Sequence, residues 1–307
     1  MSLFSAPFSP DREAALVTGA GNGIGRAVAQ ALVGEGVRTV FADVREETVR
    51  TAVATSPRPE LAIPWVGDLA QPESCEALMQ FAQSKLGLVT HFVHSASPPR
   101  REVDHVLAVD DATWRQMRAV NVDAGFQLAR GLARTLIAAQ RPGSFLMLTS
   151  LHAETPRNLP HYSTSKAALA MLVKELAKSL GRFGIRVNAL CPGPVLTPLL
   201  AKYLSDEEKR QRRLVHIPFG RFGEAVVTSN MTVMHEGFAR VTEIQYGELT
   251  DPDGLRYRIP FNTAMDGNTV EMSVEQAQYG KAAADYQATL QFLESDISGI
   301  RKALRGD

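Results

Sequence analysis

Short apolar runs alternate with longer stretches of helical periodicity through the first two thirds of the chain. A compact apolar run predicts a buried strand, and apolar residues that recur every three or four positions predict a helix with one buried face. Strands that alternate with helices predict a parallel, doubly wound sheet, because parallel strands need a crossover connection. The six predicted strands span residues 14–18, 37–42, 61–66, 88–93, 143–149 and 185–190.

The stretches between these runs predict the crossover helices. Pro72 is expected to open one of them, and Pro98 with Pro99 breaks the chain after the fourth strand. The predicted helices span residues 26–33, a segment that begins near 45, and residues 72–86, 112–139 and 162–180. We therefore expect an α/β fold of the Rossmann-like class.

A glycine-rich turn, Thr18–Gly25, joins the first predicted strand to the first predicted helix. Such a turn lets a pyrophosphate approach bare backbone, and the amides and dipole of the helix start hold its negative charge. Glycines also serve tight turns, so this motif alone leaves a structural role open. The candidate cofactor contacts in the turn are Gly19, Asn22, Gly23, Ile24 and Gly25.

Carboxylates follow the second and third predicted strands. Asp43 stands at the distance from the turn where a carboxylate meets the adenosine ribose hydroxyls, which favours NAD. A 2'-phosphate would be repelled there, although Arg45 keeps NADP possible as a less favoured cofactor. The alternative is that Asp43 only caps the helix that begins near Arg45. Asp68 is expected to border the adenine.

Tyr162 and Lys166 lie four residues apart, which puts both side chains on one helical face. The ammonium favours the phenolate, so Tyr162 can act as a general acid or base near neutral pH. Ser150, directly after the fifth strand, can hold a carbonyl oxygen. An ordinary amphipathic helix with a surface Tyr and Lys would give the same spacing. Asn121, amid apolar neighbours, faces a cavity or bonds nearby backbone.

Composition excludes several classes of protein. The 307 residues are 45% hydrophobic with a formal net charge of zero, so we expect one sizeable core and neither a nucleic-acid partner nor a charged membrane surface. Cys75 and Cys191 are far apart, and the first residues lack a signal peptide, which predicts a reducing, cytoplasmic location. No apolar run is long enough to insert in a membrane, and the seven histidines form no ligand-spaced cluster, so no metal site is expected.

The motifs together resemble the short-chain dehydrogenases/reductases over residues 12–224. The matching residues are Thr18–Gly25, Asp68–Leu69, Asn121, Ser150, Tyr162, Lys166, Pro192–Gly193 and the segment 218–224. The resemblance implies an NAD(P)-dependent oxidoreductase that transfers a hydride between a nicotinamide and the carbonyl or secondary alcohol of a small molecule. It also implies a homo-oligomer, formed through the helices that hold Asn121 and Tyr162.

The same resemblance implies a role for each catalytic residue. Tyr162 would donate or accept the proton, and Lys166 would lower the pKa of Tyr162 and bind the nicotinamide ribose. Ser150 would orient the carbonyl, Asn121 would support a water-linked proton relay, and Thr197 would meet the nicotinamide carboxamide. Further implied cofactor contacts are Leu69, Ala96, Pro192, Gly193 and Val195. Residues 154–160 and 196–217 are expected to form the wall and lid of the substrate site.

Two segments depart from the family pattern. The stretch His94–Ser97 stands where the family usually has Asn-Asn-Ala-Gly, which puts the packing beside the adenosine ribose in question. After Glu224 the usual last helix and strand are missing. We therefore expect the strand 185–190 at the sheet edge, with residues 255–259 as the local candidate to cover it.

The tail, residues 225–307, is expected to form a second unit after a dinucleotide-binding and catalytic domain at 1–224. It resembles the C-terminal part of flagellar basal-body proximal rod proteins, on Asp266–Met272, Glu275, Gln278–Tyr279 and Tyr286–Leu290. A heptad seam predicts a long amphipathic helix over 269–304, which lies on its own domain or pairs with another helix or rod-type protein. The resemblance leaves two alternatives to an enzyme: a flagellar rod assembly component with a vestigial domain, or a fusion join near Glu224. We favour the enzyme, since residues 12–224 retain every chemical part.

Overall fold

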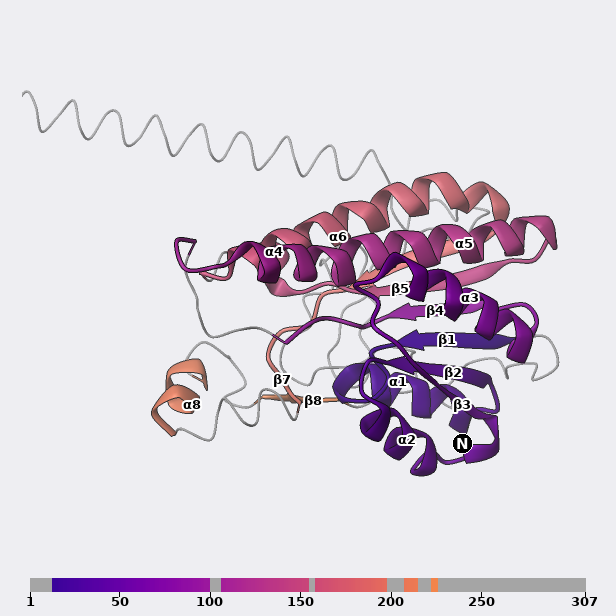
Figure 1. The fold of residues 1–307 in the computed structure, drawn as a ribbon, viewed down its shortest axis with the longest axis horizontal. Helices are drawn as coiled ribbons and strands as arrows, with labels where there is room; N and C mark the ends of the chain where they lie inside the picture. The colour runs from indigo at the N-terminus through magenta and orange to yellow at the C-terminus, as the bar shows by residue number, and fades with distance from the viewer. Residues whose placement is uncertain (1–12, 100–105, 155–157, 198–206, 215–221, 226–307) are drawn as a thin grey trace, which may run out of the picture. The chain divides into compact units, whose positions relative to one another are not determined.

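The computed structural model describes residues 13–99, 106–154, 158–197, 207–214 and 222–225. Within them, six parallel strands form one sheet in the order β3-β2-β1-β4-β5-β6 (Figure 1). This order confirms the predicted doubly wound sheet. The strands are β1 Ala14–Thr18, β2 Arg38–Asp43, β3 Ala62–Val66, β4 His91–His94, β5 Gly143–Leu148 and β6 Ile185–Leu190.

Helices cover both faces of the sheet. Buried residues of α1 and α2 pack on one face, and buried residues of α3, α5 and α6 pack on the other. The longer helices are α1 Gly23–Gly34, α2 Glu46–Ala54, α3 Pro72–Leu86, α4 Asp111–Arg118, α5 Ala124–Ala138, α6 Pro160–Leu180 and α8 Glu207–Leu214. Short helical turns are η1 Pro59–Leu61, η2 Ala119–Asp123, η3 Leu151–Ala153 and η4 Gly181–Phe183.

The alternation of side chains along each strand divides the core into two layers. Successive residues of a strand point to opposite faces, so a strand covered on both faces must be apolar throughout. Leu16, Phe92 and Phe145 belong to the layer under α3, α5 and α6. Val17 and Phe41 belong to the layer under α1 and α2. This double coverage is why the strands read as continuous apolar runs.

Most predicted elements agree with the structure to within about three residues at their ends, and two of the differences are informative. The fourth strand begins at His91 rather than at residue 88, although the backbone amide of Thr90 already donates to the carbonyl of Ala14. The helical segment predicted over 112–139 is confirmed, but it is not one regular α-helix. A π-helical turn, Ala119–Asp123, separates α4 from α5, and the amide of Ala124 donates to the carbonyl five residues earlier, at Ala119.

In the described part of the chain, β6 is the last strand of its sheet. A second, two-stranded parallel pair, β7 Val195–Leu196 with β8 Gly223–Glu224, was not predicted. The predicted segment 255–259 and the helix 269–304 lie outside the described residues, and the domain boundary after Glu224 stays a prediction. Among the helices that the structure describes, none has the length and apolar character needed to span a membrane.

Candidate active site

The glycine-rich turn carries β1 into α1 with almost no room for side chains. Gly19 and Gly23 have positive φ angles of 69° and 55°, which strain any residue with a Cβ. A Cβ on Gly19 would lie 2.7 Å from the backbone nitrogen of Ala96, and one on Gly25 would overlap the carbonyl oxygen of Gly19. The turn is therefore a bare-backbone cradle, as a bound pyrophosphate requires.

Asp43 lies beside this cradle at the end of β2. Its carboxylate oxygen Oδ2 accepts from the amide of Gly21 at 2.9 Å, and Oδ1 accepts from the amide of Arg45 at 3.1 Å. The N-cap of α2 is Arg45 itself, so the helix-capping alternative for Asp43 does not describe its main contact. With the Asn22 amide turned so that its oxygen faces α2, Arg45 donates to that oxygen.

The third strand adds a carboxylate to the same edge of the sheet. Asp68 follows β3, and its Oδ1 accepts from the amide of Ala70 at 2.9 Å, while Leu69 is buried. The amide of Gly67 donates to the carbonyl of Asp43 at 3.1 Å, which ties the ends of β2 and β3 together. Asp43 and Asp68 therefore stand at the neighbouring carboxyl ends predicted for the nucleotide side.

His94 lies between the glycine-rich turn and the π-helical turn that holds Asn121. The Thr18 hydroxyl oxygen lies near the amides of Ser95 and Ala96, both at 3.3 Å, and 2.9 Å from His94 Nδ1. His94 Nε2 lies 3.1 Å from the carbonyl oxygen of Val120. A carbonyl only accepts, so Nε2 carries the proton and Nδ1 accepts from Thr18. The ring is 1% exposed and neutral, because burial and then the charge of Lys166 lower its pKa to about 4.

Asn121 occupies the π-helical turn next to this histidine contact. Its side chain is fully buried, and Nδ2 donates to the Ser165 hydroxyl at 2.8 Å and lies 3.2 Å from Met117 Sδ. Its Oδ1 has no hydrogen-bond partner among the described residues. The Ser165 hydroxyl in turn donates to the carbonyl of Tyr162 at 2.7 Å. Asn121 is thus joined to α6 through Ser165, and its Oδ1 remains as an acceptor for a further group.

Tyr162 and Lys166 lie on the buried face of α6. They are 6% and 3% exposed, so the ordinary surface-helix alternative is wrong. Lys166 Nζ donates to the carbonyl of Leu148 at 2.7 Å and lies 5.7 Å from the centre of the Tyr162 ring. Ser150 follows β5, is 4% exposed, and accepts from the amide of His152 at 3.2 Å. A phenol beside a buried ammonium is an arrangement suited to proton transfer.

The model of the short chain dehydrogenase family matches residues 13–208. This chain belongs to the short-chain dehydrogenase family. It is 34% identical over 220 residues to galactitol 2-dehydrogenase (L-tagatose-forming) from Cereibacter sphaeroides, across 71% of this chain and 85% of that protein. It is also 34% identical over 211 residues to L-xylulose reductase from Bos taurus, across 68% and 83%.

A solved structure shows the same architecture. Actinorhodin polyketide ketoreductase, crystallised with NADPH, is 27% identical and superimposes with a TM-score of 0.66, covering 73% of this chain and 89% of that chain. The present chain is therefore an enzyme of the dehydrogenase/reductase type.

The loop after β6 brings one of the remaining predicted contacts of this short-chain dehydrogenase, Thr197, to the cradle. The amide of Leu151 donates to the carbonyl of Pro192 at 3.4 Å, which joins the loop to the turn after Ser150. A Cβ on Gly23 would lie 2.9 Å from Thr197 Cγ2. Thr197 therefore lies against the glycine-rich turn, and Val195, two residues before it, is buried in β7. Gly193 follows Pro192 in the same loop, between β6 and β7.

Three residues near the site were not predicted for it. His94 was visible only as a departure from the family pattern, while Ser165 and His152 gave no signal in the sequence. The His152 ring packs edge-on against Tyr162, with 5.6 Å between ring centres. These roles depend on contacts between distant segments, which spacing along the chain does not reveal.

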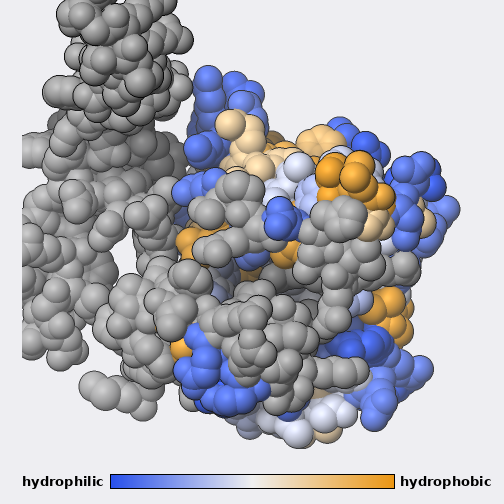
Figure 2. Space-filling model, turned by 90° about the vertical axis from the view of Figure 1, so that its left-hand side faces the viewer, coloured by the Kyte–Doolittle hydropathy of each residue, from blue (hydrophilic) through white to orange (hydrophobic). Residues whose placement is uncertain are grey.

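Other chemistry at this edge is limited within the described residues. They contain no group of three or more His, Cys, Asp or Glu that could hold a metal ion. Burial raises the pKa of the Cys191 thiol, so this short-chain dehydrogenase presents it as a neutral thiol near neutral pH. Figure 2 shows the side toward which the strands point, where hydrophobic residues form separate patches among hydrophilic ones. This mixed polarity does not select a substrate class.

Proposed function

We propose that this enzyme transfers a hydride between NAD and the carbonyl or secondary alcohol of a small molecule, with Tyr162 as the general acid or base. The observation that carries the proposal is the buried pair of Tyr162 and Lys166 on α6. If the Tyr162 hydroxyl only formed hydrogen bonds to solvent, there would be no reason to bury the ammonium of Lys166 beside it. A buried ammonium is costly, so its position 5.7 Å from the centre of the Tyr162 ring supports a functional role.

The residues divide the chemistry among them. The bound nicotinamide supplies or accepts the hydride. Lys166 holds its positive charge against the ring of Tyr162, anchored by the carbonyl of Leu148, and a positive charge there favours the phenolate over the phenol. Tyr162 then takes the proton from an alcohol or gives one to a developing alkoxide. Ser150 orients the reacting oxygen.

Asn121 supports this proton transfer from behind α6. Its amide nitrogen is committed to Ser165, which holds the backbone of Tyr162, so Asn121 fixes the start of the catalytic helix. Its free buried Oδ1 can accept from a water, and a buried acceptor without a partner is costly. We infer that a water at this acceptor links the site to a proton relay.

The preference for NAD is part of the proposal and rests on Asp43. Its carboxylate stands beside Gly21, where it can accept from the ribose hydroxyls and repel a 2'-phosphate. Arg45 lies on the same side but is engaged with the Asn22 amide, which supports NAD further. The related ketoreductase structure contains NADPH, so both cofactors occur in the family.

For the substrate we propose only a class of compound, and for the oligomeric state only a homo-oligomer. The similarity to galactitol 2-dehydrogenase and L-xylulose reductase favours polyols and ketoses as the first compounds to test. Homo-oligomer formation through α5 and α6 is supported by their exposed Phe126 and Met171. The rod-protein resemblance of residues 225–307 is outside this proposal, because the family match ends at residue 208.

Replacing Tyr162 by Phe tests the proposal. Turnover is first established for the full chain with galactitol and NAD, and with L-xylulose and NADH. Tyr162→Phe is expected to lower turnover by about a hundredfold to ten-thousandfold, because general acid–base catalysis is worth that much, while NADH binding is retained. Ser163→Ala, the next residue on α6, is the control and should keep the wild-type rate. An unchanged rate in Tyr162→Phe would refute the assignment.

A further inference from the structure

One residue, His152, contacts both Ser150 and Tyr162 in this short-chain dehydrogenase. Ser150 is the N-cap of η3, and its hydroxyl oxygen accepts from the backbone amide of His152 at 3.2 Å. The ring of the same histidine lies edge-on against Tyr162, with 5.6 Å between ring centres and 79° between ring planes. A single residue therefore meets the turn after β5 through its backbone and the start of α6 through its side chain.

The backbone of α6 does not by itself fix the phenol of Tyr162. The amide of Tyr162 donates to the carbonyl of Leu159 at 3.1 Å, and the Ser165 hydroxyl donates to the carbonyl of Tyr162 at 2.7 Å. These bonds hold the main chain, but a tyrosine ring still rotates about its side-chain torsions. The position of the phenol oxygen therefore depends on the groups that pack against the ring.

The groups around this ring differ in rigidity. Met117 and Leu159 belong to the same buried cluster as Tyr162, and both carry flexible aliphatic chains. Lys166 Nζ lies 5.7 Å from the ring centre. His152 instead presents a planar ring, and aromatic rings with centres about 4.5–7 Å apart favour edge-on or offset contacts over a face-to-face sandwich. A planar neighbour of this kind restricts the rotation of the phenol more than an aliphatic chain does.

We propose that His152 is a positioning residue, which holds the phenol of Tyr162 where its hydroxyl and that of Ser150 reach the same reacting oxygen. The proposal rests on the proposed function, in which Ser150 orients that oxygen and Tyr162 exchanges a proton with it. Lys166 supplies the charge that favours the phenolate, whereas His152 supplies the orientation. Proton transfer needs heavy atoms within about 2.6–3.2 Å, so a phenol that leaves this position transfers its proton less often.

Replacing His152 by Leu and by Phe tests this role. Both variants keep the backbone amide that bonds Ser150, so only the ring contact changes. Leucine has a similar volume without a ring, and phenylalanine restores a ring without the nitrogens. His152→Leu should lower kcat by about tenfold to a hundredfold, because a displacement of about 1 Å can cost a hundredfold, and His152→Phe should stay within about threefold of the wild type.

The measurement separates orientation from loss of folded enzyme. The full chain is assayed with the substrate for which turnover has been established, and kcat is expressed per NADH-binding site counted by fluorescence titration. The KM for the substrate and the pH dependence of the rate should be unchanged in both variants, because the proposed role of His152 is neither to bind the substrate nor to set the pKa of Tyr162. His152→Ala takes the place of His152→Leu if the leucine variant binds no NADH, with the same expected loss.

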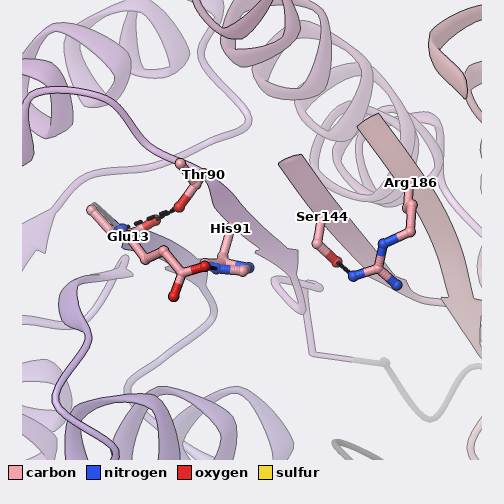
Figure 3. Close-up of polar contacts among 6 residues, drawn as sticks. Glu13, Thr90, His91, Ser144 and Arg186 are labelled. Atoms are coloured by element: carbon pink, nitrogen blue, oxygen red, sulfur yellow. Dashed lines mark hydrogen bonds and ion pairs between the residues drawn. The ribbon is translucent and has the colours of Figure 1, made fainter. Parts of the chain in front are cut away.

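The matched control, His91→Leu, makes the same exchange at the opposite end of the sheet. His91 opens β4, whereas the catalytic residues lie beyond the carboxyl ends of the parallel strands. Figure 3 shows the contacts at this amino end, where Glu13 Oε1 lies 3.7 Å from His91 Nε2 and Arg186 donates to the Ser144 hydroxyl at 3.3 Å. His91→Leu should therefore keep the wild-type kcat per NADH-binding site.

Several results would overturn the proposal. A wild-type kcat in His152→Leu would show that the ring is not needed, and equal losses in His152→Leu and His152→Phe would assign the effect to the ring nitrogens. A raised substrate KM in His152→Phe would make the histidine a substrate contact, and a shifted pH dependence would make it a partner in ionisation. Equal losses in His91→Leu and His152→Leu would also refute a local role.

Tyr162→Phe, assayed in parallel, distinguishes failure of this role from failure of the proposed function. Lost turnover in Tyr162→Phe with full turnover in His152→Leu refutes only the role of His152. Full turnover in Tyr162→Phe refutes the proposed function and the role of His152 with it.

Discussion

The two halves of the sheet contribute opposite kinds of groups to the candidate active site. The half formed by β1, β2 and β3 offers bare backbone, with Gly19 and Gly25 leaving no space for a Cβ. The half formed by β4, β5 and β6 offers buried polar side chains, with His94, Asn121 and Lys166 each 3% exposed or less. Bare backbone can hold a ligand by shape and dipole, whereas buried ionisable groups can move protons. Binding and proton transfer should therefore respond to different substitutions.

The buried polar groups of the second half are kept in place by the backbone. Lys166 bonds the carbonyl of Leu148, and His94 bonds the carbonyl of Val120 at the π-helical turn. A π-turn leaves backbone groups outside the usual helical pairing, and such turns often occur at functional sites. The irregular turn and the neutral histidine therefore form one arrangement that positions Asn121.

Replacing Lys166 by Met should have the largest effect of the substitutions that sharpen this comparison. A neighbouring positive charge shifts a pKa by about one to three units, so its loss should lower alcohol oxidation near neutral pH by about tenfold to a thousandfold. The pH–rate profile should also move to higher pH. Lys174→Met, an exposed position on the same helix, is the control. An unchanged rate and profile in Lys166→Met would remove Lys166 from the mechanism.

His94 should make stability depend on pH. Its pKa is lowered from 6.5 to about 4 in the folded chain, by burial first and by Lys166 second. The unfolded chain therefore takes up the proton first, so stability is fully present above about pH 6.5 and is lost as pH falls toward about 4. At about 1.4 kcal/mol per pH unit the full loss is on the order of 3 kcal/mol.

The His94→Asn variant isolates this contribution. Asparagine cannot take up the proton, so the free energy of unfolding of the variant should fall less steeply than that of the wild type between about pH 6.5 and 5. Urea unfolding of both chains at a series of pH values measures the difference. Parallel curves for the two chains would show that His94 is protonated equally in the folded and unfolded states.

Substitution of Asp43 should have the smallest of these effects. It should change cofactor binding by the half of the sheet formed by β1, β2 and β3, and leave proton transfer unchanged. Asp43→Ala should weaken NAD by about tenfold and narrow its advantage over NADP, because a charged hydrogen-bond acceptor is lost. Asp43→Asn keeps an acceptor for the Gly21 amide but removes the charge, so it separates cofactor choice from the shape of the turn. Steady-state KM values for NAD and NADP measure both variants. A wild type that uses NADP better would contradict the role of Asp43.

Apolar periodicity predicted most of the described fold, because continuous apolar runs are what strands covered on both faces require. Apolar periodicity did not predict the π-helical turn at Asn121. The contact between His94 and Val120 at that turn joins segments that are distant in sequence. The periodicity also missed the β7–β8 pair, since two-residue strands have no period to detect.

The site was predictable where a motif fixes the spacing. Tyr162 and Lys166 lie one helical turn apart, and Gly19 to Gly25 form one turn and the start of α1, so the family resemblance located them directly. The neighbours of His91 across the sheet were not predictable, because only the strand register brings Ser144 beside it and Arg186 beside Ser144.

The central claim is that the chain is a working nicotinamide enzyme whose first half binds the cofactor through bare backbone. Fluorescence titration of the full chain with NADH tests it most directly, with Gly25→Val as the comparison, because a side chain there would overlap the Gly19 carbonyl. We predict saturable binding of one NADH per chain and loss of about a hundredfold or more in affinity in the variant, as a side chain would exclude the pyrophosphate from the turn. No saturable signal in the wild type, or equal affinity in Gly25→Val, would contradict the account.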